Sequence, residues 1–152
     1  MKFSTREDIR APIDTVFAAV TDFDHFERQV LRRGADVSRI DAGGAEGVGM
    51  SWRTRIPIRG RTREITSELT EMRTPTGIVL ESHSAGVEST FVVDLLALSQ
   101  TRTRLRVSLD LRPTSFSARL FVQSLKLAKA SLSRRFSDRV AGFAAEIQNR
   151  SA

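Results

Sequence analysis

The sequence predicts an α+β domain in which an antiparallel sheet packs against one long C-terminal helix. Residues 115–150 repeat apolar side chains at steps of three and four, which is the spacing of one helix face. Between residues 35 and 113, apolar and polar side chains mostly alternate instead, as in strands with one covered face. Short turns separate these strands, so neighbouring strands should pair in antiparallel hairpins.

The first element is a strand over residues 2–10. Its alternation places Glu7 on the face that carries the apolar side chains, so Glu7 is a candidate inward-facing carboxylate. Pro12 then opens a helix, because proline suits the first helical turn. A second short helix carries Phe26 and ends at Gly34.

Six strands follow the two helices. We expect them at about residues 35–41, 50–58, 61–72, 78–84, 88–98 and 104–112. The glycine-rich residues 43–47 should form a hairpin turn and not a phosphate-binding loop, because no helix follows them. Residues 91–98 are nearly all apolar, which predicts a strand in the centre of the sheet.

The C-terminal helix has no proline between Ser115 and Arg150. At about 1.5 Å per residue it would run roughly 50 Å, whereas a strand of about ten residues covers about 33 Å. Lys129 and Arg139 lie close to the centre of its apolar stripe. Because an unpaired buried cation is costly, each should reach water, pair with a carboxylate or face a polar ligand. Arg139 is the better ligand anchor, since its planar guanidinium matches carboxylates and phosphates.

The composition suits a single domain over residues 1–152, and the absence of cysteine excludes disulfides and thiolate metal sites. No apolar run approaches the roughly 20 residues of a membrane-spanning helix, so we expect a cytoplasmic protein. The net charge of +6 favours anionic partners. The cations are dispersed along the strands, however, and lack the interleaved aromatics of an RNA-binding sheet, so we do not expect a nucleic-acid partner.

Two leucines interrupt the polar side of the long helix. Leu120 and Leu127 lie opposite the apolar stripe, near Lys126 and Arg134. Either they cover loops, or they form a dimer contact or a peripheral contact with an anionic membrane. The sequence leaves open whether the protein is a monomer or a homodimer.

Three short segments and the terminal helix carry a family resemblance. The segments are Glu-Asp-Ile-Arg-Ala-Pro-Ile-Asp-Thr-Val-Phe at residues 7–17, Gly-Val-Gly-Met at 47–50 and Thr-Arg-Leu at 103–105. In this order they resemble the START-like superfamily in its broad SRPBCC sense, and in particular bacterial proteins described as polyketide cyclase/dehydrase or lipid-transport proteins. The resemblance implies a helix-grip fold, in which a curved seven-stranded sheet wraps the C-terminal helix around an apolar cavity. It assigns no catalytic residue, because no enzyme subfamily's catalytic pattern matches this sequence.

Our leading hypothesis is that a hydrophobic small molecule or lipid binds between the sheet and the helix. The residues expected to contact it are Glu7, Phe26, Trp52, Leu125, Leu132, Phe136 and Arg139. The aromatic and leucine side chains would form apolar walls, and the two charged side chains would orient a polar group. Core packing and ion pairing are the commoner roles of such side chains.

Two other functions stay open. One is a cyclase or dehydratase type of enzyme acting on a polyketide-like or aromatic substrate in the same cavity, with His83 or Glu7 as the base. The other is a basic interaction module for a membrane surface, an RNA or a ribosome. His25 and His83 are far apart in a chain without cysteine, so we expect no metal site and no other cofactor.

Overall fold

The structure is a computed structural model that describes residues 1–41, 46–58 and 60–151, without the side chain of residue 151. Its elements are β1 (Lys2–Ile9), α1 (Ile13–Val20), α2 (Phe23–Arg32), β2 (Asp36–Arg39), β3 (Ser51–Ile58), β4 (Arg61–Arg73), β5 (Gly77–Ser84), β6 (Val87–Ser99), β7 (Arg102–Pro113), α3 (Phe116–Lys126) and α4 (Lys129–Ser151). Most of the turn predicted at residues 43–47 lies outside the described residues.

The strands form one 7-stranded sheet in the order β1-β7-β6-β5-β4-β3-β2, and each neighbouring pair is antiparallel. From β2 to β7, strands that follow each other in the chain are also neighbours in the sheet, as expected when short turns join them. β1 lies beside β7, with Glu7 opposite Leu105. The predicted α+β class with an antiparallel sheet is confirmed.

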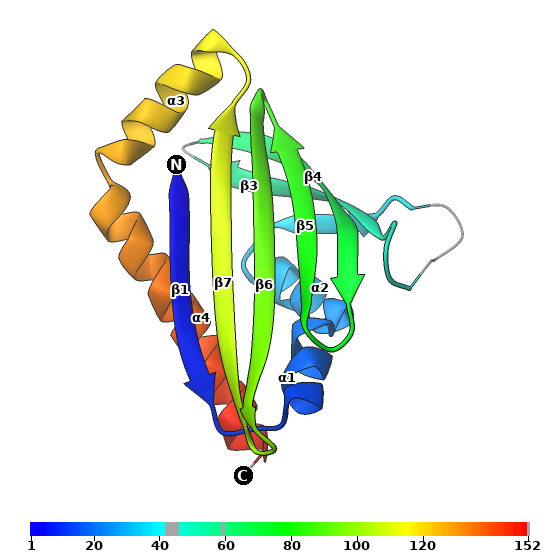
Figure 1. Cartoon of the computed structure of the whole chain (residues 1–152). Coiled ribbons are helices and arrows are strands. Elements are labelled where there is room, and N and C mark those ends of the chain that lie inside the picture. The colour runs from blue at the N-terminus through cyan, green and yellow to red at the C-terminus, as the bar shows by residue number, and fades with distance from the viewer. Residues whose placement is uncertain (42–45, 59, 152) are drawn as a thin grey trace.

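Helices α1, α2 and α4 lie on one side of the sheet and leave the other side open (Figure 1). β6 shows the effect, because Val93 and Leu95 are buried whereas Leu96 and Leu98 are exposed. The strand is central in the sheet order, as its apolar run predicted. That run does not mean that both faces are covered, since the exposed leucines alternate with the buried residues and point to the open side.

The largest fully buried side chains join the sheet and the helices in one core. Leu69, Ile78 and Leu105 come from β4, β5 and β7, and each is at most 2% exposed. Val16 of α1 and Ile147 of α4 belong to the same cluster. The last turns of α4 are therefore anchored on the sheet.

The C-terminal segment is not one continuous helix, contrary to the prediction. Leu127 and Ala128 separate α3 from α4, and the two helices meet at an angle (Figure 1). The amides of both residues bond to carbonyls three residues back, and the Ser124 hydroxyl donates to the Phe121 carbonyl at 2.6 Å. Such local hydrogen bonds bend a helix without proline or glycine.

The bend lets α3 cover the end of the sheet that a straight helix would run past. Ala118 and Val122 of α3 are buried, and α3 packs against β7. Just before α3, the Thr114 hydroxyl donates to the Gly86 carbonyl in the turn between β5 and β6 at 2.8 Å. Each half of the C-terminal segment therefore covers a different part of the inner face of the sheet.

Candidate functional site

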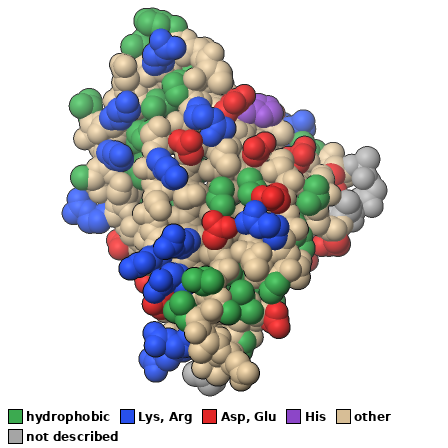
Figure 2. Space-filling view, in the orientation of Figure 1, with side chains coloured by type: hydrophobic (Ala, Val, Ile, Leu, Met, Phe, Trp, Pro, Cys, Tyr) green, Lys and Arg blue, Asp and Glu red, His purple; other side chains and the backbone are tan. Residues whose placement is uncertain are grey.

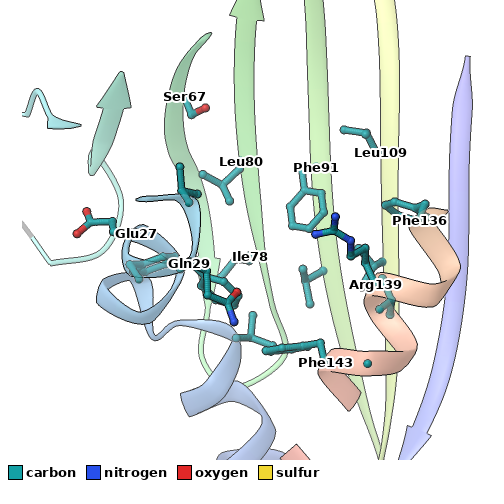
Figure 3. Close-up of a pocket in the computed structure, with 18 of the residues that line it drawn as sticks. Glu27, Gln29, Ser67, Ile78, Leu80, Phe91, Leu109, Phe136, Arg139 and Phe143 are labelled. Atoms are coloured by element: carbon teal, nitrogen blue, oxygen red, sulfur yellow. The ribbon is translucent and has the colours of Figure 1, made fainter. Parts of the chain in front are cut away.

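The inner face of the sheet, α2 and α4 line a cavity of ≈ 880 Å³. Its walls are mostly apolar. The sheet contributes side chains such as Trp52, Leu80 and Phe91, and α4 contributes Phe136 and Phe143 (Figure 3). Mostly apolar concave sites of this size are typical of small-molecule binding.

Trp52 forms one wall of this cavity and is 7% exposed. Its indole Nε1 donates to Glu27 Oε1 at 2.7 Å, and its ring centroid lies 5.4 Å from that of Phe23. Both partners belong to α2, so this side chain ties α2 to β3. Because its single polar atom is satisfied, Trp52 can present an apolar surface to the cavity.

A charged pair lies next to Trp52. Arg39 lies over the indole ring at 5.6 Å, and it donates two hydrogen bonds of 2.7 and 2.8 Å to the Asp41 carboxylate. The Ser51 amide donates to the same carboxylate at 3.1 Å. These bonds, led by those from Arg39, hold the pKa of Asp41 well below its ordinary value because they stabilise the ionised form.

Aromatic contacts connect α2 and α4 at the edge of the cavity. The rings of Phe26 and Phe143 lie 5.6 Å apart, and His25 packs 5.9 Å from Phe26. His25 Nε2 also lies 4.0 Å from a carboxylate oxygen of Glu146 on α4. The two helices therefore meet at this edge through these side chains.

Charged side chains at the cavity come from both helices. Glu27 and Arg33 belong to α2 and its C-terminal cap, and Asp138, Arg139 and Glu146 belong to α4. Figure 3 shows Arg139 reaching from α4 into the space in front of the sheet. Arg139 is exposed, so its charge stays in contact with water while its stem lines the cavity.

The structure brings together four of the seven residues that the sequence suggested as ligand contacts. Phe26, Trp52, Phe136 and Arg139 line the cavity. They come from α2, β3 and α4, so the fold alone makes them neighbours. Their contact with a ligand stays a prediction.

The other three residues lie outside the cavity. Glu7 is half-buried on β1, the strand on which α4 packs, and it is not among the described residues that line the cavity. Leu125 and Leu132 flank the bend between α3 and α4, which carries them away from the cavity.

The two candidate bases are also outside this cavity. His83 is exposed and lies at the edge of a smaller cavity, next to Ser82 and Ser84 on β5. Glu7 lies on β1 outside the large cavity, as described above. An enzyme that uses either group as its base in the large cavity is therefore not supported by their positions.

Sequence reasoning missed the cavity residues of the central strands. Leu80, Phe91 and Leu109 are directly opposite one another across β5, β6 and β7. The facing of β5 could not be decided from its sequence, so this row was not found. Glu27 was missed as well, although its place four residues after Phe23 on an amphipathic helix is a signal that it faces the same side.

Within the part of the chain that the structure describes, no helix is long and apolar enough to span a membrane. The described His, Asp and Glu side chains form no group of three or more that could hold a metal ion.

A curved antiparallel sheet, a long C-terminal helix and an apolar cavity between them define a protein of the helix-grip class. Residues 1–148 match the family described as polyketide cyclase / dehydrase and lipid transport. The chain belongs to this family, which is part of the START-like superfamily, as its sequence motifs suggested. No curated protein sequence matches the chain.

Solved structures share the fold at low sequence identity. The Zhui aromatase/cyclase from Streptomyces sp. R1128 is 15% identical, with a TM-score of 0.69 over 100% of this chain and 96% of that chain. A protein from Thermus thermophilus is also 15% identical, with a TM-score of 0.68 over 100% of both chains. A START superfamily protein from Mycobacterium smegmatis is 14% identical, with a TM-score of 0.55 over 88% of this chain and 95% of that chain. At these identities the likeness shows the fold alone.

Proposed function

We propose that the protein binds a hydrophobic small molecule or lipid in the cavity between the sheet, α2 and α4. The observation that carries this proposal is the volume of ≈ 880 Å³ behind mostly apolar walls. Phe26, Trp52 and Phe136 would supply apolar contact area, and Arg139 would meet a polar group of the ligand at the edge.

The size of the cavity argues against a packing defect. A space of ≈ 880 Å³ is far larger than the share of liquid volume of one water molecule, about 30 Å³. The space must therefore hold water or a ligand. Apolar walls offer water few hydrogen-bond partners, so a hydrophobic ligand is the better occupant.

Native mass spectrometry of the protein as purified from cells tests this proposal. We expect adducts of discrete mass on the wild type. Leu109→Trp should remove them, because Leu109 lines the cavity and a larger ring would occupy its space. Leu120→Trp is the matched control, since Leu120 is exposed on α3. A wild type that carries no adduct and also takes up no hydrophobic probe would contradict the proposal.

We also propose that α3 docks on anionic membranes. Phe116, Leu120 and Leu127 are 74%, 53% and 91% exposed and share one side of the helix. Residues 112–137 contain six Lys or Arg and no Asp or Glu. Figure 2 shows hydrophobic and basic side chains gathered over α3. An apolar stripe with basic neighbours is the composition that binds an anionic lipid surface.

Sedimentation with lipid vesicles tests the docking proposal. The protein should bind vesicles that contain phosphatidylserine more tightly than vesicles of phosphatidylcholine alone, and added salt should weaken binding. Leu120→Glu should weaken it further, whereas Leu96→Glu, an equal change on the open side of the sheet, should not. Equal binding to both vesicles, or a response to Leu96→Glu as large as to Leu120→Glu, would contradict docking through α3.

A further inference from the structure

A second cavity of ≈ 410 Å³ lies under α3, at the other end of the inner face of the sheet. Along β4 and β5, successive inward-facing residues line first the large cavity and then this small one. On β4, Ser67 lines the large cavity, whereas Ile65 and Arg63, two and four residues before it, line the small one. On β5, Leu80 lines the large cavity and Ser82 the small one. Because residues two apart share a face of a strand, the two cavities are consecutive sections of one trough.

A row of serines marks the border between the two sections. Ser67, Ser82 and Ser89 are opposite one another across β4, β5 and β6. Ser67 Oγ and Ser82 Oγ share a hydrogen bond of 2.7 Å. On the large-cavity side the next row is Leu80 and Phe91, so the serines place a row of hydroxyl groups between two mostly apolar sections of the trough.

Arg63 is a charged side chain that lines the small cavity. Its guanidinium lies 5.2 Å from the ring centroid of Phe121 on α3. Its Nε is buried and has no hydrogen-bond partner among the described residues. A buried donor without a partner costs free energy, so an acceptor at this position would be favoured.

The contrast with the open side of the sheet supports this interpretation. There, Arg53 and Arg55 pair with Glu64 at 3.1 and 3.4 Å. Glu64 precedes Ile65 and follows Arg63, so it points to the opposite face from both. On the outer face of the β3–β4 hairpin, arginines thus have a carboxylate partner, whereas the described inner-face residues of this hairpin include no carboxylate.

Charge also distinguishes the two sections of the trough. The described lining of the large cavity includes the carboxylates of Glu27, Asp138 and Glu146, and these are matched in number by Arg33, Arg135 and Arg139. The described lining of the small cavity has no carboxylate, but it includes Arg61 as well as Arg63. The formal charges around the large cavity therefore cancel, whereas an anionic group would be attracted to the small cavity.

We propose that the small cavity binds the anionic group, a carboxylate or a phosphate, of an amphipathic ligand whose apolar part occupies the large cavity. Arg63 donates to the anion through its Nε and its terminal guanidinium nitrogens, and Ser89 supplies a hydroxyl to the same anion. From Ser84 to Ile78 along β5 the trough is about 20 Å long at about 3.3 Å per residue, which suits an extended chain. This inference rests on the function proposed above and adds the chemical class of the ligand.

The test is titration of the protein with palmitate, cetyl phosphate and cetyl alcohol, followed by the fluorescence of Trp52, the single tryptophan. The three probes share an apolar chain and differ in the head group. The wild type should bind at least one of the two anions about tenfold or more tighter than the alcohol, as expected for charge-assisted hydrogen bonds. The tighter anion identifies the head group as carboxylate or phosphate.

Arg63→Gln should remove this preference and leave the affinity for cetyl alcohol within about twofold. Arg53→Gln, which removes the same charge from the open side, should leave all three affinities unchanged. Arg63→Lys should keep part of the preference, because it retains the charge without the planar fork. If Arg63→Gln does not fold, Arg63→Lys and Ser89→Ala decide the question through a reduced preference for the anion.

Two outcomes overturn the inference in distinguishable ways. If the wild type binds all three probes equally, or if Arg63→Gln keeps the preference for the anion, the small cavity is not an anion site and the binding of hydrophobic molecules stands. If the wild type binds none of the probes, the proposed function fails for chain-like ligands and the inference fails with it.

Discussion

Asp41 is the residue at which protonation bears most directly on the folded structure. Its carboxylate accepts hydrogen bonds from Arg39 and from the Ser51 amide, and so it links the ends of β2 and β3 beside Trp52. The pKa of Asp41 is lower in the folded protein than in the unfolded chain. The unfolded chain therefore binds more protons in acid, and the stabilisation by this group is lost as the pH falls.

We predict that Asp41→Asn lowers the stability at neutral pH and that this difference from the wild type shrinks in acid. The difference should be full above about pH 4, the ordinary range of an aspartate, and should fall as the pH drops below it. Urea unfolding at about pH 7 and about pH 3 measures it. Asp36→Asn is the control, because Asp36 is exposed on β2. A difference that stays constant down to about pH 3 would contradict the assignment.

At the scale of single residues, the sequence predicted which kinds of side chain line the cavity better than it predicted which positions lie at the cavity. Trp52 and Phe136 line the cavity, because broad apolar side chains on covered faces tend to face open space where a cavity exists. Glu7 does not, although its face was predicted correctly, because α4 packs on β1 and no described residue of that strand lines the cavity. The face on which a side chain lies follows from the local sequence period, whereas the space in front of that side chain depends on which distant element packs over the strand.

At the scale of elements, the bend between α3 and α4 explains most of what the sequence could not predict. Val122 and Val140 are buried on different helices, yet they are 140 − 122 = 18 residues apart, which is five turns at about 3.6 residues per turn. The apolar stripe continues in phase across Leu127 and Ala128, so its period carries no sign of a bend. The strands were predicted well, because alternation and short turns are local signals.

We predict that Ile147→Ala lowers the free energy of unfolding by about 2–5 kcal/mol, the usual cost of truncating a fully buried aliphatic side chain. Ile147 is 1% exposed and anchors the last turns of α4. Leu127→Ala, at the exposed bend, should change it by no more than about 0.5 kcal/mol. Urea denaturation of both variants measures the contrast, and equal losses would show that the two ends of the C-terminal segment are anchored alike.

At the scale of the whole molecule, the inner face of the sheet both packs in the core and forms the trough. Its buried end, around Leu69 and Leu105, packs against α1 and α4 and holds the fold together. The remainder forms the trough that α2, α3 and α4 cover without filling. A domain built in this way gains stability from an occupant, because the ligand supplies apolar contacts that the chain itself does not make.

We therefore predict that removing the copurified ligand lowers the melting temperature and that adding it back restores it. A ligand at about 100 times its dissociation constant adds about 2.7 kcal/mol, which at about 2–4 °C per kcal/mol corresponds to roughly 5–10 °C for a chain of this length. Calorimetry before and after extraction with organic solvent measures the shift, with mass spectrometry to confirm that the ligand has left. The filled variant Leu109→Trp should melt at the same temperature before and after extraction. A wild type that loses its ligand without any change in melting temperature would mean that the ligand does not occupy the folded cavity.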